Sequence, residues 1–268
     1  MRYVYAVWTD EVVHGFGRGK REHAPIMLAS LARHCDCTAL MQYHTDEPTK
    51  QTAIDACGDM PLILSQMYTH ELDQLIQTKI VRLLCQPFEY GDEVFVMDVD
   101  VIVQADIFDV FKDSDFDVGI TKRHYDYFSP INCGVWCFRY NERTQRFIEL
   151  YVTQMLYGTW PPYLEFTRSY DETYPNDRYV FPADIKKRRM SDQDFLCAVY
   201  KNGMKVPFDC KVVDIGWQYN YCPPSDLLGA DEACRQLTAA LGDPTHKVLH
   251  FKGRPMKEAM IEIGATLK

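Results

Sequence analysis

The chain has no hydrophobic run that approaches the ~20 uninterrupted apolar residues needed to cross a bilayer. Its opening stretch, Met1–Trp8, runs straight into Thr9 and Asp10 without the cleavage pattern of a signal peptide. It also lacks any Cys-x-x-Cys pair, because its ten cysteines are dispersed along the sequence. Dispersed cysteines in a long chain are typical of reduced thiols rather than of a disulfide scaffold. These absences predict a cytoplasmic protein without a transmembrane segment.

The chain has fewer basic residues (29 Lys and Arg) than acidic ones (38 Asp and Glu), and its formal net charge is −9 at pH 7. This balance argues against a protein that wraps duplex nucleic acid, since neutralising phosphates dominates that affinity. The one dense basic run is Lys186, Lys187, Arg188 and Arg189. Two interpretations of this run stay open: a solvated loop or helix edge, or a patch for an anionic partner such as a phospholipid head group or a nucleic acid.

The 268 residues, of which 47% are hydrophobic, can bury about three quarters of the unfolded surface. Strand-like runs alternate with helical patterns, which predicts an α/β fold with a doubly wound, mostly parallel central sheet. No internal repeat is present, and we expect a single domain over 1–268. We predict strands at 2–8, 38–43, 61–64, 93–103, 117–122 and 131–140, helices at 24–34, 71–84, 142–157 and 191–201, and an irregular segment over 158–189.

Two carboxylates, Asp98 and Asp100, interrupt the otherwise apolar stretch 93–103. If this stretch is one buried strand, residues two apart point to the same side and the two carboxylates converge. Two anions in a poorly solvated place repel one another and require a nearby cation. The pattern favours a metal or phosphate site, and the alternative is a strand end that happens to be acidic.

The Asp-x-Asp spacing alone is not informative, because it recurs elsewhere in the chain. Asp113, Asp115 and Asp117 repeat it in a stretch that we expect to be a solvated loop, and Asp192 and Asp194 repeat it once more. What distinguishes the first pair is the apolar run before it and the short amphipathic turn predicted at 106–111.

Four motifs follow one another along the chain: Phe95-Val-Met-Asp-Val-Asp100, Asn132-Cys-Gly-Val-Trp136, Ser191-Asp-Gln-Asp-Phe-Leu196 and His250-Phe-Lys-Gly-Arg-Pro-Met-Lys257. In this order they resemble the GT-A glycosyltransferases, specifically family eight, which contains glycogenin and bacterial galactosyl- and glucosyltransferases. The resemblance extends over most of the chain. It implies a GT-A fold with a Rossmann-like nucleotide-sugar-binding half at 1–105 and an acceptor-side half with a C-terminal metal-ligand segment at 106–268.

The resemblance assigns a divalent metal to Asp98, Asp100 and His250. It implies a retaining hexosyltransferase that uses a nucleotide-sugar donor, with the metal neutralising the diphosphate. An imidazole beside two carboxylates suits Mn²⁺ and tolerates Mg²⁺. For His250 alone, the alternative is a partly buried histidine at a strand end.

The same resemblance implies roles for other residues. It places Asp192 on sugar hydroxyls and Gln193 at the anomeric carbon as the catalytic pair. The donor-binding residues it implies are Thr9, Asp10, Lys79, Asn132, Gly134, Gly253 and Lys257. The sequence departs from the family pattern at two residues expected to bind the phosphates. Arg82 is an alternative to Lys79 for this role, and Lys257 is followed by Glu-Ala instead of Pro-Trp.

The acceptor does not follow from the sequence, and a glycan, a lipid-linked glycan, a protein and a modified nucleic-acid base all stay open. Two other functional classes are also open. A haloacid-dehalogenase-like phosphotransferase also carries Asp-x-Asp after an apolar strand, but usually on its first strand and with Thr or Val where this chain has Ile102. A non-catalytic module that binds nucleotide or glycan is the other.

Overall fold

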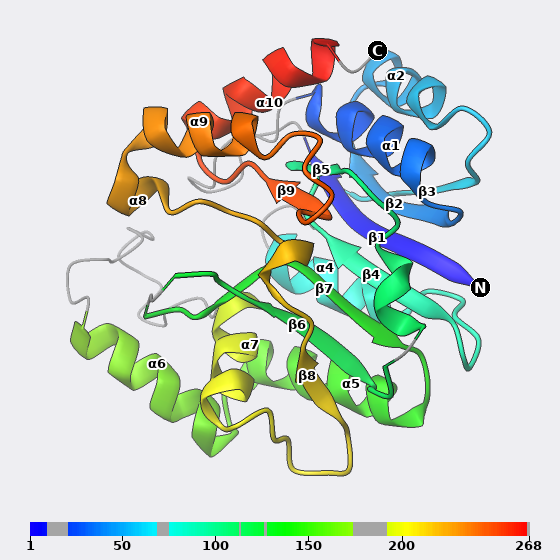
Figure 1. Cartoon of the computed structure of the whole chain (residues 1–268). Coiled ribbons are helices and arrows are strands. Elements are labelled where there is room, and N and C mark those ends of the chain that lie inside the picture. The colour runs from blue at the N-terminus through cyan, green and yellow to red at the C-terminus, as the bar shows by residue number, and fades with distance from the viewer. Residues whose placement is uncertain (10–20, 69–74, 113, 126–127, 174–191, 267–268) are drawn as a thin grey trace.

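The structure is a computed structural model that describes residues 1–9, 21–68, 75–112, 114–125, 128–173 and 192–266. A central sheet separates two layers of helices (Figure 1). No helix within these ranges has the length and apolar character needed to cross a bilayer.

The central sheet has seven strands in the order β3-β2-β1-β4-β7-β6-β8. The β3-β2-β1-β4 run is parallel, β7 is antiparallel to both β4 and β6, and β6 is parallel to β8. The predicted mostly parallel sheet is therefore confirmed. The strands of this sheet are β1 (Arg2–Thr9), β2 (Thr38–His44), β3 (Leu62–Gln66), β4 (Glu93–Met97), β6 (Val118–Lys122), β7 (Ile131–Arg139) and β8 (Val212–Asp214).

Helices cover both faces of this sheet, as expected for a doubly wound fold (Figure 1). On one face, α1 and α2 pack together and contribute to a core cluster with Phe95, Phe108 and Tyr219. On the other face, α4, α5 and α7 enclose a second cluster around Trp136 and Phe195. The helices are α1 (His23–His34), α2 (Glu47–Cys57), α4 (Leu75–Leu84), α5 (Glu142–Tyr157), α6 (Pro161–Thr173), α7 (Asp192–Lys201), α8 (Ser225–Leu228), α9 (Ala230–Ala239) and α10 (Arg254–Thr266), with short 3₁₀ turns η1 (Phe108–Phe111) and η2 (Trp217–Tyr219).

The stretch 93–103 is not one strand, contrary to our expectation. It divides into β4 in the large sheet and β5 (Val101–Val103), which pairs antiparallel with β9 (Val248–His250) in a separate two-stranded sheet. Asp98 and Asp100 lie in the break between β4 and β5. Their convergence is therefore produced by a change of direction of the backbone between two sheets and not by strand alternation.

The irregular segment expected over 158–189 is also wrong where the structure describes it, because 161–173 forms α6. Two prolines begin this helix, where their missing N–H groups cost no hydrogen bond. Tyr163 and Phe166, three residues apart, are 0% and 5% exposed and supply its buried face. Such a short apolar face is easily overlooked among the polar residues around it. The helices α2, α9 and α10 were likewise not predicted.

The expected solvated loop is not uniformly solvated over its described residues, 114–117. Asp115 is exposed, but Asp117 is 3% exposed and accepts hydrogen bonds from Arg143 Nε and Nη2 at 2.9 and 2.8 Å. It also accepts from Asn141 Nδ2 and the Lys211 backbone N–H. Burial raises the pKa of Asp117, but these donors outweigh it and the net pKa is lowered. This carboxylate therefore joins β6, α5 and the segment before β8.

We expect Asp117→Asn to lower the free energy of unfolding at pH 7 by about 1–3 kcal/mol, because an amide offers one acceptor oxygen where the buried carboxylate accepts four hydrogen bonds with two. Asp117 has a folded-state pKa below its ordinary 3.8, so its contribution is complete above that pH and is lost as the pH falls below it. Urea unfolding of both proteins between pH 7 and pH 3 measures the effect. Asp115→Asn, at an exposed pair with Lys211, is the matched control and should change stability by less than about 0.5 kcal/mol.

Candidate functional site

The acidic pair lies at the carboxyl end of β4, where ligands bind in open α/β sheets. Two backbone hydrogen bonds fix the turn that carries it. The Asp98 N–H donates to the carbonyl of Gly134 on β7 at 2.8 Å, and the Phe251 N–H donates to the carbonyl of Asp100 at 2.8 Å. The first bond ties the turn to the large sheet, and the second ties it to the end of β9.

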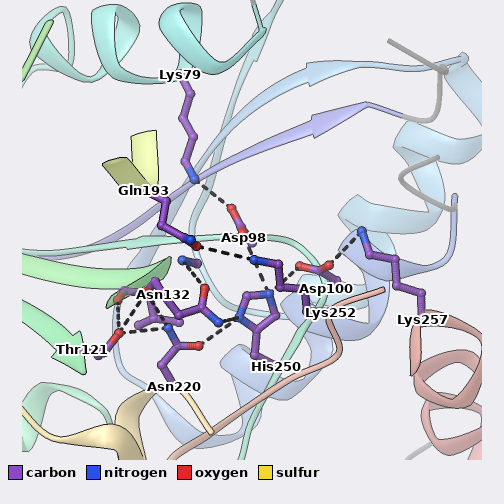
Figure 2. A network of polar contacts seen from close by, with 12 residues as sticks. Lys79, Asp98, Asp100, Thr121, Asn132, Gln193, Asn220, His250, Lys252 and Lys257 are labelled. Carbon is purple, nitrogen blue, oxygen red and sulfur yellow. Dashed lines mark hydrogen bonds and ion pairs between the residues drawn. The ribbon is translucent and has the colours of Figure 1, made fainter. Parts of the chain in front are cut away.

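Three side chains converge here: Asp98, Asp100 and His250. Each offers one ligand atom, and these atoms all lie within 4.8 Å of one another (Figure 2). His250 Nε2 is 3.3 Å from Asp100 Oδ1 and 3.9 Å from Asp98 Oδ2. The side chain of Asp98 is 38% exposed and that of Asp100 only 7%, so the cluster opens to solvent on the Asp98 side.

The other ring nitrogen of His250, Nδ1, lies on the side away from the carboxylates and contacts two asparagines. Asn220 Nδ2 donates to the carbonyl of Asn132 and to the Thr121 hydroxyl, at 2.8 and 2.9 Å, which fixes the orientation of its amide. Asn220 Oδ1 then faces His250 Nδ1 at 2.9 Å. Because an amide oxygen only accepts, we assign the proton to Nδ1. Asn132 Nδ2 makes a longer contact, 3.3 Å, with the same nitrogen.

With Nδ1 facing Asn220, Nε2 is the ring nitrogen that lies toward the two carboxylates. Two carboxylates this close together require a nearby cation, and a metal ion bound by Nε2 and one oxygen of each carboxylate would supply it. Two carboxylate oxygens and one imidazole nitrogen form a donor set that suits a divalent transition metal. A hydrogen bond behind the ring is also the usual support of a metal-bound histidine. The cluster therefore fits the predicted metal site.

Each carboxylate is also paired with a lysine. Lys79 Nζ from α4 lies 2.8 Å from Asp98 Oδ1, and Lys257 Nζ from α10 lies 2.8 Å from Asp100 Oδ2. Burial raises the pKa of Asp100, but Lys257 and His250 outweigh it and hold that pKa well below its usual range. The pKa of Asp98 is lowered in the same way, by Lys79 and His250 against burial and the neighbouring Asp100. Both carboxylates are ionised at neutral pH.

Gly134 gives the imidazole the space that it occupies. A Cβ at this position would lie 2.1 Å from His250 Cε1 and 3.0 Å from Asp98 Oδ2. The Gly134 N–H donates to Asn132 Oδ1 and so orients the Asn132 amide, whose Nδ2 contacts the His250 ring. Gly134 itself lies directly beside that ring. Asn132 is 2% exposed. The structure thus places both residues behind and beside His250, and their contact with a donor stays a prediction.

Gln193 lies on α7, near the cluster (Figure 2). Its Oε1 accepts from Arg123 Nη2 at 3.4 Å and from Lys252 Nζ at 3.5 Å. Arg123 is 8% exposed, and its Nη1 donates to the Tyr125 hydroxyl at 2.6 Å. The amide of Gln193 is therefore oriented by two cations, and a role at an anomeric carbon stays a prediction.

The structure describes some of the remaining predicted residues and not others. Arg82 donates to Gln42 Oε1 at 2.6 Å and to the Gln66 carbonyl at 3.3 Å, near the ends of β2 and β3, whereas Lys79 pairs with Asp98. Gly253 has a φ of +95°, a conformation that glycine adopts without strain. Thr9 ends β1 with 9% exposure. Asp10, Lys186, Lys187, Arg188, Arg189 and the side chain of Asp192 lie outside the described residues.

Some members of the site were not predicted from the sequence as functional residues. Lys252 falls inside the motif His250–Lys257, but nothing in that motif indicates its contact, and Asn220 lies outside the four motifs. Arg123 and Thr121 carry no sequence signal, because β6 brings them to the site from outside every motif.

The solved structures that this chain resembles include three glycosyltransferases. GlyE, a glycosyltransferase of Streptococcus pneumoniae TIGR4, superposes with a TM-score of 0.57 at 15% identity, over 98% of this chain and 61% of that one. Mouse xyloside xylosyltransferase 1 gives 0.54 at 12% identity, over 94% and 98%. The galactosyltransferase LgtC, in complex with donor and acceptor sugar analogs, gives 0.52 at 14% identity, over 99% and 96%.

The chain has a GT-A glycosyltransferase fold. No protein-family profile and no curated protein sequence matches it. The chain spans 61% of the length of GlyE, but nearly all of xyloside xylosyltransferase 1 and LgtC. At these identities the GT-A fold is what the matches establish, and the chemistry has to be argued from the site.

We expect Gly134→Ala to displace the His250 ring and weaken Mn²⁺ binding by about tenfold or more, since the new methyl group occupies the position of the ring. Gly119→Ala is a matched control on β6: its Cβ would lie 2.5 Å from the Ile215 side chain and away from the cluster. Both variants should lose thermal stability, but only Gly134→Ala should lose metal affinity in titrations followed by electron paramagnetic resonance. Equal Mn²⁺ affinity in the two variants would contradict the role given to Gly134.

Proposed function

We propose that the chain is a retaining glycosyltransferase that moves a hexose from a nucleotide sugar, with uridine diphosphate as the leaving group and a bound divalent metal. One observation carries the proposal: two ionised carboxylates and an imidazole converge at the carboxyl end of β4 in a GT-A fold. A diphosphate carries negative charge that grows as its bond to the sugar breaks. A cation-binding cluster at this edge of the sheet is suited to receive that charge.

Asp98, Asp100 and His250 would hold the metal, with Mn²⁺ favoured over Mg²⁺ because of the imidazole. When bound, the ion supplies positive charge to the diphosphate and fixes its position. Lys79 and Lys257 add two further positive charges next to the cluster. Gly253 leaves open space on its Cβ side, where no atom lies closer than 3.9 Å, so backbone can approach a phosphate there.

Transfer breaks the bond from the anomeric carbon to the phosphate oxygen and forms a bond from that carbon to the acceptor oxygen. In the proposed retaining route, the acceptor enters on the face that the phosphate leaves, and the departing phosphate oxygen takes the acceptor's proton. Gln193 is assigned to the opposite face of the sugar, where its amide dipole stabilises positive charge at the anomeric carbon. Arg123 and Lys252 orient that amide. Asp192 is assigned to the sugar hydroxyls.

The acceptor is assigned to the side of the site where aromatic rings collect. His124, Tyr125, Trp217, Tyr221 and His246 form a connected group, with ring centroids 4.3–5.9 Å apart. Tyr125 joins this group to Gln193 through Arg123, and Trp217 is 39% exposed. Exposed aromatic faces with polar edges suit the ring of a glycan. They also stack nucleobases, but the net charge of −9 opposes a nucleic-acid acceptor.

The two alternative functions are less well supported. A haloacid-dehalogenase-like phosphotransferase usually carries its acidic pair on the first core strand, whereas here the pair follows the fourth strand in the chain, and the solved structures that match are glycosyltransferases. A non-catalytic binding module would have no need for a complete set of three metal-ligating side chains. Turnover of nucleotide sugars, compared with turnover of phosphomonoesters, distinguishes these alternatives.

Asp100→Asn should lower metal-dependent hydrolysis of the donor sugar by about 100-fold or more, because it removes one of the ligands that neutralise the leaving group. A thermal-shift screen of uridine and guanosine diphosphate sugars, with and without Mn²⁺, first identifies a donor that the wild type binds. Hydrolysis of that donor is then measured for the variant and for Asp115→Asn, which lies at an exposed ion pair and should keep full activity. Unchanged hydrolysis by a folded Asp100→Asn variant would refute the metal assignment.

The retaining route predicts the stereochemistry of the first product. In the absence of an acceptor, water takes its place, and the free hexose released first should have the same anomeric configuration as the donor. Proton NMR of the anomeric signals, recorded before mutarotation, provides the measurement. Release of the opposite anomer would show an inverting reaction and would leave the metal assignment untouched.

A further inference from the structure

The two acidic side chains divide their oxygens between two kinds of partner. Asp98 Oδ2 and Asp100 Oδ1 face His250 Nε2, at 3.9 and 3.3 Å. The opposite oxygens, Asp98 Oδ1 and Asp100 Oδ2, each lie 2.8 Å from a lysine ammonium. Lys79 and Lys257 come from different helices on different sides of the cluster (Figure 2). A metal held by the inner oxygens and the ring therefore leaves both lysines on the outer oxygens.

The charges of these groups already balance. Two carboxylates and two ammonium groups sum to zero before the imidazole is counted. A divalent ion alone would raise the sum to +2 at a place where the Lys79, Asp100 and His250 side chains are 8%, 7% and 2% exposed. Poor solvation makes such an excess costly. A nucleoside diphosphate brings at least two negative charges and removes the excess.

We propose that Lys79 and Lys257 are built-in counter-ions that make metal binding conditional on a nucleoside diphosphate. The inference rests on the proposed function and goes beyond it. The lysines oppose the metal when it arrives alone and attract the diphosphate when it arrives with the metal. Because binding equilibria are reciprocal, the nucleotide gains from the metal the same factor that the metal gains from the nucleotide. Each of the two ligands then raises the affinity of the site for the other.

A lysine could instead help the metal, by holding a carboxylate in the ligating position. The backbone already does this for both residues, since Asp98 N–H is bound to Gly134 and the Asp100 carbonyl is bound to Phe251. The Asp100 carboxylate also contacts the His250 ring, which Asn220 fixes from behind. The two carboxylates are therefore oriented without help from the lysines. The larger effect of each lysine on metal binding is the repulsion between its ammonium group and the metal ion. At these separations, removing one unit charge should change metal affinity by about tenfold or more.

The test uses Mn²⁺ and uridine diphosphate, with Lys79→Met and Lys257→Met as variants that keep the length of the side chain and remove its charge. Titrations are followed by the electron paramagnetic resonance signal of free Mn²⁺. In the wild type, saturating uridine diphosphate should tighten Mn²⁺ binding by a factor within the usual range for coupled ligands, about 5- to 150-fold. Each variant should bind Mn²⁺ alone about tenfold tighter and show a coupling factor about tenfold smaller.

Lys247→Met is the matched control. Lys247 pairs with Asp109 at 2.9 Å, and its side chain is 22% exposed, the same as that of Lys257. Its loss removes the same charge and a similar ion pair outside the cluster, so Mn²⁺ affinity and coupling should stay near the wild-type values. Lys257→Arg keeps the charge and should keep Mn²⁺ binding alone weak. Thermal melting of every variant confirms that it is folded, and the two lysines on separate helices provide independent tests.

The outcomes separate this inference from the function on which it rests. If the wild type binds Mn²⁺ and uridine diphosphate but both folded lysine variants bind Mn²⁺ alone no tighter than the wild type, the lysines are positioning groups and the inference is wrong. Independent binding of Mn²⁺ and nucleotide in the wild type would refute it as well. If the wild type binds neither Mn²⁺ nor any nucleoside diphosphate, the proposed function itself fails.

Discussion

The pairing of β5 with β9 is the constraint on which the site depends. The chain leaves the large sheet at Met97 and enters the small sheet at Val101, and the register of that small sheet places His250 opposite Val101. The residues between the two sheets are Asp98, Val99 and Asp100, which include the acidic pair. A slip of this register by one residue would turn the imidazole to the other side of β9. Neither sheet could form the cluster alone.

Everything around the cluster keeps these three side chains in one arrangement. Polar groups behind it, Asn220, Asn132 and Thr121, set the tautomer of the histidine. A glycine on β7 leaves room for the ring, and two lysines hold the outer carboxylate oxygens. The interior therefore carries a continuous polar network in which a change in one member alters the electrostatics of the others. Networks of this kind are costly to build and are suited to a site whose charge changes during a reaction.

Much of the fold could be predicted from the sequence, because its elements have strong local patterns. The strands at 2–8 and 38–43 and the helices at 24–34 and 142–157 agree closely with β1, β2, α1 and α5. Apolar runs and periodic helices carry this information within about a dozen residues. The division of 93–103 into two strands could not be predicted, because it depends on β9, which lies far along the sequence. The helix α6 was missed since its buried face is short and aromatic.

The sequence predicts which three side chains converge at the candidate site, but not the residues that orient them. Asp98, Asp100 and His250 stand in recognisable motifs, and the structure brings them together. Arg123 orients Gln193 and Asn220 orients His250, and both contacts depend on residues that are far apart in the sequence. The local pattern of residues does not encode such contacts. Lys79 and Arg82 show the same limit. They lie within one turn of a single helix, and only the three-dimensional arrangement decides which of them reaches the acidic pair.

The late position of β9 in the chain has a consequence for biosynthesis. Chains emerge from the ribosome from their N-terminal end, and early segments can begin to fold while later ones are still being made. The strands β1 to β4 can pair at that stage, but the imidazole and Lys257 arrive only about 150 residues after the acidic turn. Until then Lys79 is the one cation of the cluster that the nascent chain can offer to the acidic turn. The emerging polypeptide therefore carries a partly compensated anionic turn, and the three-residue cluster can close only after β9 has been made.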